Sequence, residues 1–223
     1  MYRQRAQSWQ PQRRQSRLKD MNGKQSELQW DKHLKIRTSG RDDSHSDQYR
    51  YPYEPTPYAV LERLAESGYI TKRNTLLDYG CGKGRAGFFL SHQTRCRCLG
   101  IEYDDRIFQA AVKNKESAVS GSRTEFVHTE AEAFTVPDEA DRFYFFNPFS
   151  SEVLQSVIGR IRESWYKNPR EALLFFYYPS DEYIAYLMTV DELCFLDEID
   201  CSDLFEGKSS RERIMVFSFD SMG

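Results

Sequence analysis

The chain has 223 residues, 39% of them apolar, and a formal net charge of −3. It is therefore long enough for one full-sized domain with a sizeable core, and it has no overall electrostatic attraction to nucleic acid. No apolar run approaches the ~20 residues that span a bilayer, and the first residues lack the apolar core of a signal peptide. Five irregularly spaced cysteines and four histidines favour free thiols in a reducing cytoplasm over a disulfide framework or a metal site.

Residues 1–50 are polar, and their first part is rich in Gln and Arg. Such a composition buries little apolar surface, so we expect a disordered or mobile arm ahead of a domain over residues 51–223. Two interpretations fit residues 1–20: an arm that contacts RNA or acidic lipid, and an extension without function. Trp30, Leu34 and Ile36 are the candidates for docking on the domain.

The stretch from Tyr49 to Tyr58 holds four tyrosines and three prolines in ten residues. The prolines predict extended backbone, followed by a helix that begins near Pro57 and stops at Gly68. Tyr53 and Thr56 are candidates for contact with a cofactor or a substrate. A stiff linker that docks the helix explains the stretch equally well, with Thr56 as the helix N-cap.

From residue 75 onward, strand and helix patterns alternate. Strands are predicted at 75–79, 96–102, 124–129, 141–147 and 171–179, and helices at 84–93, 105–119, 150–165 and 181–189. Residues 194–201 and 212–220 read as an antiparallel pair. This order predicts an α/β fold, with a doubly wound, mostly parallel seven-stranded sheet that ends in an antiparallel pair.

The first strand runs into the glycine-rich stretch LLDYGCGKGRAGFFLS, which opens a helix. Its glycines fit both a dinucleotide loop and a D-x-G-x-G-x-G loop. A carboxylate beside a pyrophosphate at ~4 Å would cost about 4 kcal/mol at an effective dielectric constant near 20. Asp78 therefore favours a cationic ligand such as S-adenosylmethionine, although a carboxylate that only caps local amides also fits. Glu102, at the end of the second strand, is placed to accept the hydroxyls of an adenosine ribose in either case.

The segments LLDYGCGKG, GIEYD, FVHTEAEAF and FYFFNPF resemble, in order and spacing, those of class I S-adenosylmethionine-dependent methyltransferases. The resemblance covers residues 51–220 and implies a Rossmann-like fold. It places Glu102 at the ribose and Tyr103 against the adenine. Glu130 and Ala131 fall at the adenine amino group, with Glu132 as the alternative. The residues that it places around the methionyl half are Asp78, Gly80, Cys81, Gly82 and Gly84. Lys83 and Arg85 are expected to face solvent.

The fourth strand ends in Asn147, Pro148 and Phe149. In relatives that methylate planar amines or amides, an Asn or Asp, two prolines and an aromatic residue stand here. The resemblance therefore implies that these residues line the site of methyl transfer and that Asn147 also contacts the cofactor. The single proline leaves amine specificity open, and a simple strand break also fits. Tyr178, after the fifth strand, is a further candidate for the acceptor site.

The function expected is methyl transfer from S-adenosylmethionine to an unidentified acceptor, either a small molecule or an amine of a protein or RNA. Nucleic acid is compatible with the sequence but not indicated by it. The alternatives are an NAD-dependent oxidoreductase and a non-catalytic binding module with a methyltransferase fold. Asp78 disfavours the oxidoreductase, and the intact glycine loop disfavours the binding module.

Overall fold

We describe a computed structural model, which places residues 26–42, 49, 51–207 and 209–220. After a helix over residues 26–34, the helices are α2 (Tyr58–Glu66), α3 (Arg85–Thr94), α4 (Asp105–Ser117), α5 (Ser151–Lys167) and α6 (Asp181–Leu187). The strands are β1 (Thr75–Tyr79), β2 (Arg97–Glu102), β3 (Thr124–His128), β4 (Arg142–Phe145), β5 (Leu173–Tyr177), β6 (Leu193–Asp200) and β7 (Arg213–Phe219). Short 3-10 helices cover Gly121–Arg123, Ala131–Ala133 and Ser202–Leu204.

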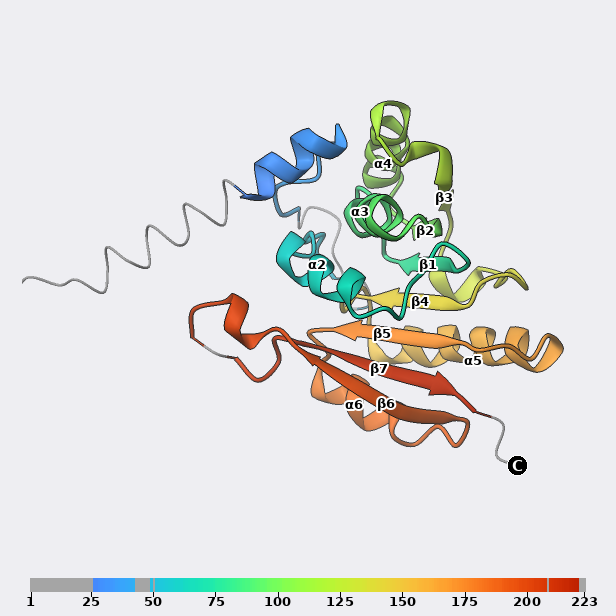
Figure 1. Ribbon diagram of the computed structural model, residues 1–223. Helices are drawn as coiled ribbons and strands as arrows, with labels where there is room; N and C mark the ends of the chain where they lie inside the picture. The colour runs from blue at the N-terminus through green and yellow to red at the C-terminus, as the bar shows by residue number, and fades with distance from the viewer. Residues whose placement is uncertain (1–25, 43–48, 50, 208, 221–223) are drawn as a thin grey trace, which may run out of the picture.

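The strands of the described chain form one seven-stranded sheet in the order β3-β2-β1-β4-β5-β7-β6 (Figure 1). β1 to β5 run parallel, and β7 pairs antiparallel with β5 and β6. This confirms the predicted α/β class, the mostly parallel sheet and the antiparallel C-terminal pair. From β1 the chain continues to β2 and β3 on one side of β1 and then crosses to β4 on the other side. This reversal of strand order creates a switch point, and open α/β sheets bind ligands at such points.

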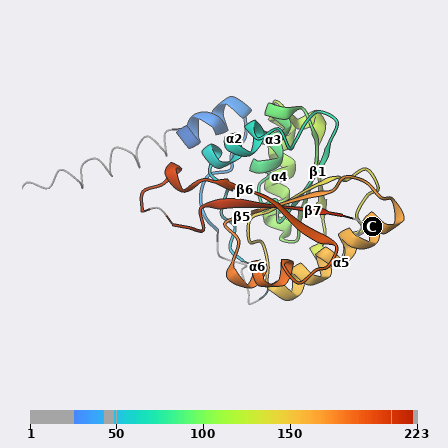
Figure 2. The ribbon, with the colours of Figure 1, turned by 60° about the horizontal axis from the view of Figure 1, so that its bottom comes forward.

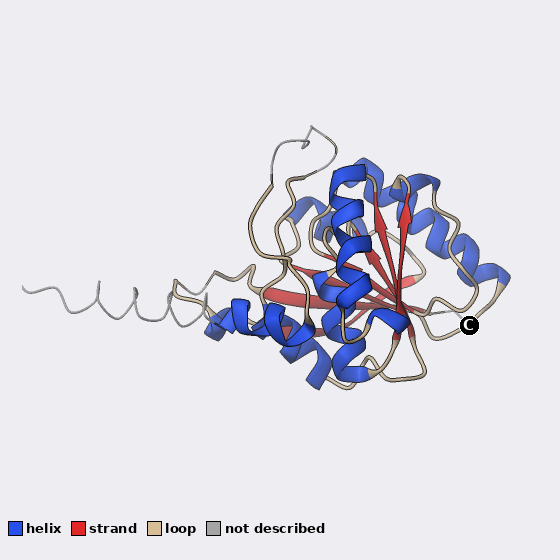
Figure 3. Ribbon diagram, turned by 90° about the horizontal axis from the view of Figure 1, so that it is seen from above, coloured by secondary structure: helices blue, strands red, loops and turns tan. Residues whose placement is uncertain are grey.

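Helices cover both faces of the sheet (Figures 2 and 3). Side chains alternate along β1: Leu77 and Tyr79 pack in the core on the side of α5 and α6, and Leu76 packs in the core with α2 and α3. Asp78, two residues after Leu76, therefore points to the α3 face, where α3 begins. This alternation is what brings a carboxylate under the first turn of a helix.

Part of the predicted N-terminal arm belongs to the domain, so the predicted boundary at residue 51 is wrong for residues 26–42. Leu34 and Ile36 are fully buried, and the Trp30 ring meets the Phe89 ring edge-on at a centroid distance of 4.9 Å. The docking predicted for these three residues is confirmed. Their apolar side chains lie on one helix and its continuation, and they bury together against α2 and α3. The rest of the predicted arm, at 1–25, 43–48 and 50, lies outside the described residues.

We call residues 26–42 the N-terminal segment. Its Asp31 forms a buried polar network with Arg85 of α3. The Asp31 carboxylate accepts hydrogen bonds from Thr38 Oγ1 at 2.6 Å and from the Tyr58 hydroxyl at 2.6 Å. Arg85 Nη2 lies 3.7 Å from Asp31 Oδ1, and Nε donates to Thr38 Oγ1 at 2.7 Å. A further ion pair joins Arg85 to Glu27.

Arg85 was expected to face solvent, but its side chain is only 4% exposed. Its guanidinium also lies over the Tyr58 ring, 4.4 Å from the ring centroid. The expectation was wrong because the partners that compensate the buried charge come from residues 26–42, far away in the sequence. A buried cation is tolerated only when such partners surround it.

No helix among the described residues is both long enough and apolar enough to cross a membrane.

The Asp31→Asn substitution should lower the free energy of unfolding by about 3 kcal/mol, because it leaves the buried Arg85 charge without one of its anionic partners. Urea denaturation measures the change. Asp203→Asn is the matched control, because Asp203 pairs with Arg63 at the surface and its side chain is 64% exposed. Its effect should be much smaller. Equal losses in the two variants would contradict a structural role for the buried network.

Candidate active site

The turn after β1 takes a shape that only glycine adopts easily. Gly80, Gly82 and Gly84 have φ of 70°, 56° and 87°. A Cβ on Gly80 would lie 2.4 Å from Pro148 Cβ, and one on Gly82 would lie 2.2 Å from the Tyr53 ring. Backbone conformation and space therefore both exclude side chains at Gly80 and Gly82.

Hydrogen bonds fasten this turn to the end of β2. The amides of Gly80 and Cys81 donate to the Ile101 carbonyl at 2.9 and 3.0 Å. The Gly82 amide donates to Glu102 Oε2 at 3.0 Å. Glu102 Oε1 accepts the amides of Tyr103 and Asp104 at 3.0 and 2.9 Å. Burial raises the pKa of Glu102, and the three amide hydrogen bonds oppose that rise.

Asp78 is a buried carboxylate with one unused oxygen. It accepts the Gly87 amide in the first turn of α3, so it does cap that helix. Its Oδ2, however, is buried and meets no donor among the described residues. Burial raises the pKa of Asp78 to about 7; the Gly87 hydrogen bond lowers it and the Glu102 charge raises it. A group that only capped the helix would not need an unsatisfied buried oxygen.

Residues 51–56, which we call the strap, cross the carboxyl edge of the sheet. In its middle, Tyr53 pairs with Asp42 through backbone hydrogen bonds of 2.8 and 3.0 Å. At its first residue, the Tyr51 amide donates to the Pro148 carbonyl at 3.2 Å. The Tyr53 hydroxyl donates to the Thr38 carbonyl at 2.5 Å. The strap is therefore held by the N-terminal segment on one side and by the turn after β4 on the other.

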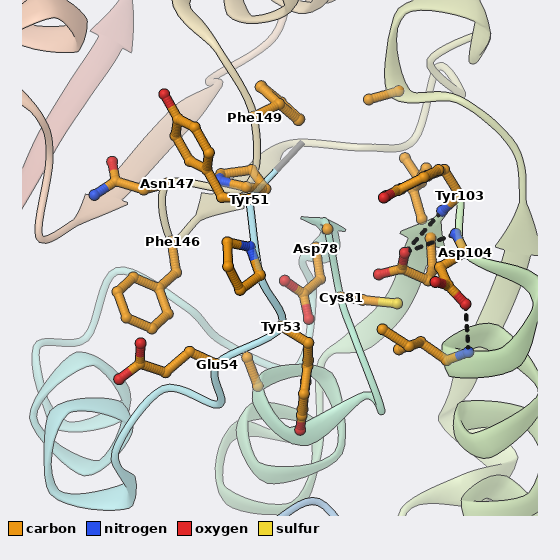
Figure 4. Close-up of a pocket in the computed structure, with 18 of the residues that line it drawn as sticks. Tyr51, Tyr53, Glu54, Asp78, Cys81, Tyr103, Asp104, Phe146, Asn147 and Phe149 are labelled. Atoms are coloured by element: carbon orange, nitrogen blue, oxygen red, sulfur yellow. Dashed lines mark hydrogen bonds between the residues drawn. The ribbon is translucent and has the colours of Figure 1, made fainter. Parts of the chain in front are cut away.

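A cavity lies between the strap, the glycine turn and the ends of β1, β2 and β4 (Figure 4). Asp78 is near its centre in this view, with Tyr103 and Asp104 on one side and Phe146 and Asn147 on the other. The predicted site residues that line it are Tyr53, Thr56, Asp78, Gly80, Cys81, Glu102, Tyr103, Ala131, Asn147, Pro148 and Phe149. The fold thus gathers most of the predicted site in one place.

Three predicted residues lie off the cavity wall. Gly82 is covered by the Tyr53 ring, and Gly84 packs against Phe88 and Phe126. Glu130 is also absent from the wall, which carries Glu132, the alternative to it, instead. The predicted strand ends at residue 129, and the short 3-10 helix over Ala131–Ala133 that follows it was not predicted; this helix determines which side chains face inward.

Thr56 lines the cavity, as predicted, but it does not take the alternative role of a helix cap. Thr56 is not the N-cap of α2, because that position is Pro57 and no side chain caps the helix. The Thr56 hydroxyl lies 3.0 Å from the hydroxyl of Tyr144, which also lines the cavity. Tyr51, Glu54 and Tyr144 also line the cavity, although no sequence motif pointed to them individually. The dense Tyr and Pro content of residues 49–58 was the only sequence signal for the first two.

The end of β4 holds Asn147 in a strained and specific orientation. Its φ is 38°, in the left-handed region, and Nδ2 donates to the Tyr178 carbonyl. Oδ1 is buried and meets no donor within the described part of the chain. Tyr178 has a φ of 51°. Because such strain costs free energy, it is usually retained where it serves a site.

Asp78 should make stability depend on pH. A raised pKa in the folded state means that the protonated form is favoured there, so its contribution is fully present below about pH 4 and is lost as the pH rises from there through about 7. Asp78→Asn should therefore exceed the parent chain in free energy of unfolding by about 2 kcal/mol at about pH 8, with little difference near pH 4. Urea denaturation at both pH values measures this. Asp203→Asn should show no such gain, and a gain for Asp78→Asn that did not depend on pH would contradict the assignment.

Comparisons with known proteins bear on this arrangement. Residues 76–165 match the family model described as "Methyltransferase domain". A protein-lysine N-methyltransferase of Saccharolobus islandicus (strain REY15A) is 31% identical over 72 residues, which is 31% of this chain and 45% of that protein. The match thus spans less than half the length of that curated relative.

Two solved structures show the same fold at low sequence identity. A TehB-like S-adenosylmethionine-dependent methyltransferase from Corynebacterium glutamicum has a TM-score of 0.52 at 16% identity, over 72% of this chain and 88% of that one. A segment of StiE O-MT has a TM-score of 0.56 at 11% identity, over 75% of each chain. The matched family model thus places a methyltransferase domain over residues 76–165, and the strand order and the solved structures show a Rossmann-like fold around it.

Proposed function

We propose that the chain binds S-adenosylmethionine in the cavity beneath the strap and transfers its methyl group to an acceptor beside Asn147. The observation that carries this proposal is the unsatisfied Asp78 Oδ2, buried at the start of α3. The N-terminus of a helix attracts anions, yet this one is faced by a carboxylate. A cationic ligand suits that position, and the pyrophosphate of a dinucleotide does not.

The residues present fit the cofactor. Asp78 would face the positively charged methionyl half, next to Gly80 and Cys81. Glu102 Oε2 accepts one amide and keeps capacity for a ribose hydroxyl, because a carboxylate oxygen accepts two hydrogen bonds. Tyr103, Ala131 and Glu132 line the cavity where the adenine would lie.

The bound cofactor would supply an already activated methyl group, so the protein has mainly to position the acceptor and exclude water. The strap contributes Tyr51 and Tyr53, which cover the cavity, and the β4 turn contributes Phe149. Asn147 Oδ1 is oriented to accept a hydrogen bond from an N–H or O–H group of the acceptor. The fixed position of Nδ2 on the Tyr178 carbonyl keeps that oxygen facing away from Tyr178.

We also propose that the protein works in the cytoplasm. The five cysteines of the sequence are all free thiols in the structure, and Cys194 is the exposed one. Free thiols suit a reducing compartment. The acceptor that we propose is either a small molecule or an amine carried by a protein or RNA, and the name of the archaeal relative adds a protein lysine as one example.

Calorimetric titration with S-adenosylhomocysteine tests cofactor binding. The parent chain should bind it, and Gly82→Ala should lose at least about tenfold in affinity, because the new methyl group displaces the Tyr53 ring and strains a φ of 56°. Gly159→Ala is the matched control, since nothing lies within 4 Å of the added Cβ in α5. Titration with NAD should show no binding. Binding of NAD in place of S-adenosylhomocysteine would favour an oxidoreductase, and binding of neither would favour a non-catalytic module.

The affinity for S-adenosylmethionine should rise with pH. Below about pH 7 the Asp78 carboxyl is protonated, so binding a cation first requires loss of that proton. Between about pH 5.5 and 7.5 the association constant should increase about tenfold. In Asp78→Asn it should be weak and nearly independent of pH over the same range. Parallel curves for the two proteins would contradict contact between Asp78 and the ligand charge.

A further inference from the structure

A second cavity lies on the other side of the strap. Its wall consists of Arg41, Tyr51, Pro52, Glu54, Pro57, Phe146, Asn147, Tyr177, Tyr178, Phe205 and Glu212. Tyr51, Pro52, Glu54, Phe146 and Asn147 also line the cofactor cavity, so the two spaces share a dividing wall. A molecule in the second cavity would therefore reach the first one at Asn147.

Aromatic rings dominate the wall of this second cavity. Tyr51, Phe146, Tyr177, Tyr178 and Phe205 belong to it, and the rings of Phe146 and Tyr177 pack at a centroid distance of 4.7 Å. Aromatic faces attract an alkyl chain by burial and an ammonium group through the ring quadrupole. The wall thus suits a slender apolar chain that ends in a cation.

Two polar groups of the wall, Asn147 and Glu212, offer acceptor oxygens to a ligand. The Asn147 amide nitrogen is used by the Tyr178 carbonyl, which leaves the buried Oδ1 as the available atom. The Tyr177 hydroxyl donates to Glu212 Oε2 at 2.7 Å, so its proton is also used. A ligand that matches this wall donates hydrogen bonds, as an amine or ammonium group does.

The charges of the wall agree with the hydrogen-bond pattern. It carries two carboxylates, Glu54 and Glu212, and one guanidinium, Arg41, whose nitrogen lies 3.7 Å from Glu54. Arg211 stacks on the Tyr178 ring at 4.8 Å but is not part of the wall. The remaining negative charge, on Glu212, favours a cation and disfavours a phosphate or carboxylate ligand.

We propose that this second cavity is the acceptor site and that it takes an alkylamine the size of a lysine side chain. The inference rests on the proposed methyltransferase function and names the acceptor of that same site. The ammonium group binds near Glu212 and loses a proton to solvent, and the neutral nitrogen approaches Asn147 Oδ1. Its lone pair forms the new N–C bond while the S–CH₃ bond breaks and leaves its electron pair on sulfur. The methylated nitrogen then releases a second proton to water.

The experiment uses the full chain and radiolabelled S-adenosylmethionine at about pH 9, where a useful fraction of an alkylamine is neutral. The probes are butylamine, a lysine-containing peptide, 4-methylphenol and butyric acid. The two amines should accept label, and the phenol and the acid should not. Comparison of butylamine with the peptide distinguishes a free amine from a protein side chain as the source of the same group.

Two variants test where the amine binds, and a third is their control. Glu212→Gln should lower kcat/KM for the amine about tenfold through KM, since it removes the charge but keeps an acceptor for Tyr177. Asn147→Gly, which tolerates the left-handed φ, should lower kcat. Glu192→Gln is the matched control, because Glu192 also accepts a tyrosine hydroxyl, that of Tyr166 at 2.6 Å, but lies in neither cavity. It should change nothing.

Titration of every variant with S-adenosylhomocysteine separates a defect in cofactor binding from a defect in acceptor binding. If the parent chain does not bind it, the proposed function and this inference both fall. If the parent binds it but prefers the phenol or the acid, the acceptor assignment alone is overturned. Unchanged amine kinetics in Glu212→Gln have the same meaning. Should Asn147→Gly lose cofactor binding, Glu212→Gln decides the matter, because Glu212 lines only the second cavity.

Discussion

The structure of the site depends on one constraint, a carboxylate buried at the point where β1 ends and α3 begins. The strand pleat turns Asp78 toward α3, and the glycine turn leaves room above it. One oxygen of Asp78 caps the helix through Gly87, and the other has no donor in the described chain. The cost of burying that charge is reflected in its pKa of about 7. A free-energy cost of this kind is recovered when a cation enters the cavity, so binding and ionisation are coupled.

A second set of charges fixes the strap beside the cavity. Arg85 follows the glycine turn directly, and its guanidinium is enclosed by Glu27, Asp31 and Thr38 of the N-terminal segment. Thr38 in turn accepts the Tyr53 hydroxyl through its carbonyl. The helix that carries the cofactor turn is thus linked to the strap that covers it. Because these groups are buried and mutually satisfied, the cover is part of the folded domain.

The strap also divides the space at the edge of the sheet. On one side lie Gly80 and several carboxylates, which suit a charged nucleoside, and on the other lie aromatic rings with the Asn147 and Glu212 oxygens. Asn147 belongs to both sides, and its strained backbone is held by the bond from its amide to Tyr178. Methyl transfer requires two ligands to meet in line, and Asn147, which lines both cavities, marks the boundary at which they would meet.

The sequence alone determined the sheet, the order of its helices, and the positions of Asp78 and Glu102 at the strand ends. These features follow from local rules: alternation of apolar residues, the φ values that only glycine adopts easily, and the common edge at which parallel strands end. Only the tertiary structure decided that residues 26–42 belong to the domain, that Arg85 is buried, and that Glu132 rather than Glu130 reaches the cavity wall. Each of these depends on partners distant in the chain or on a local turn within a loop. A buried charge looks the same in sequence as a solvated one until the groups that compensate it have been brought beside it.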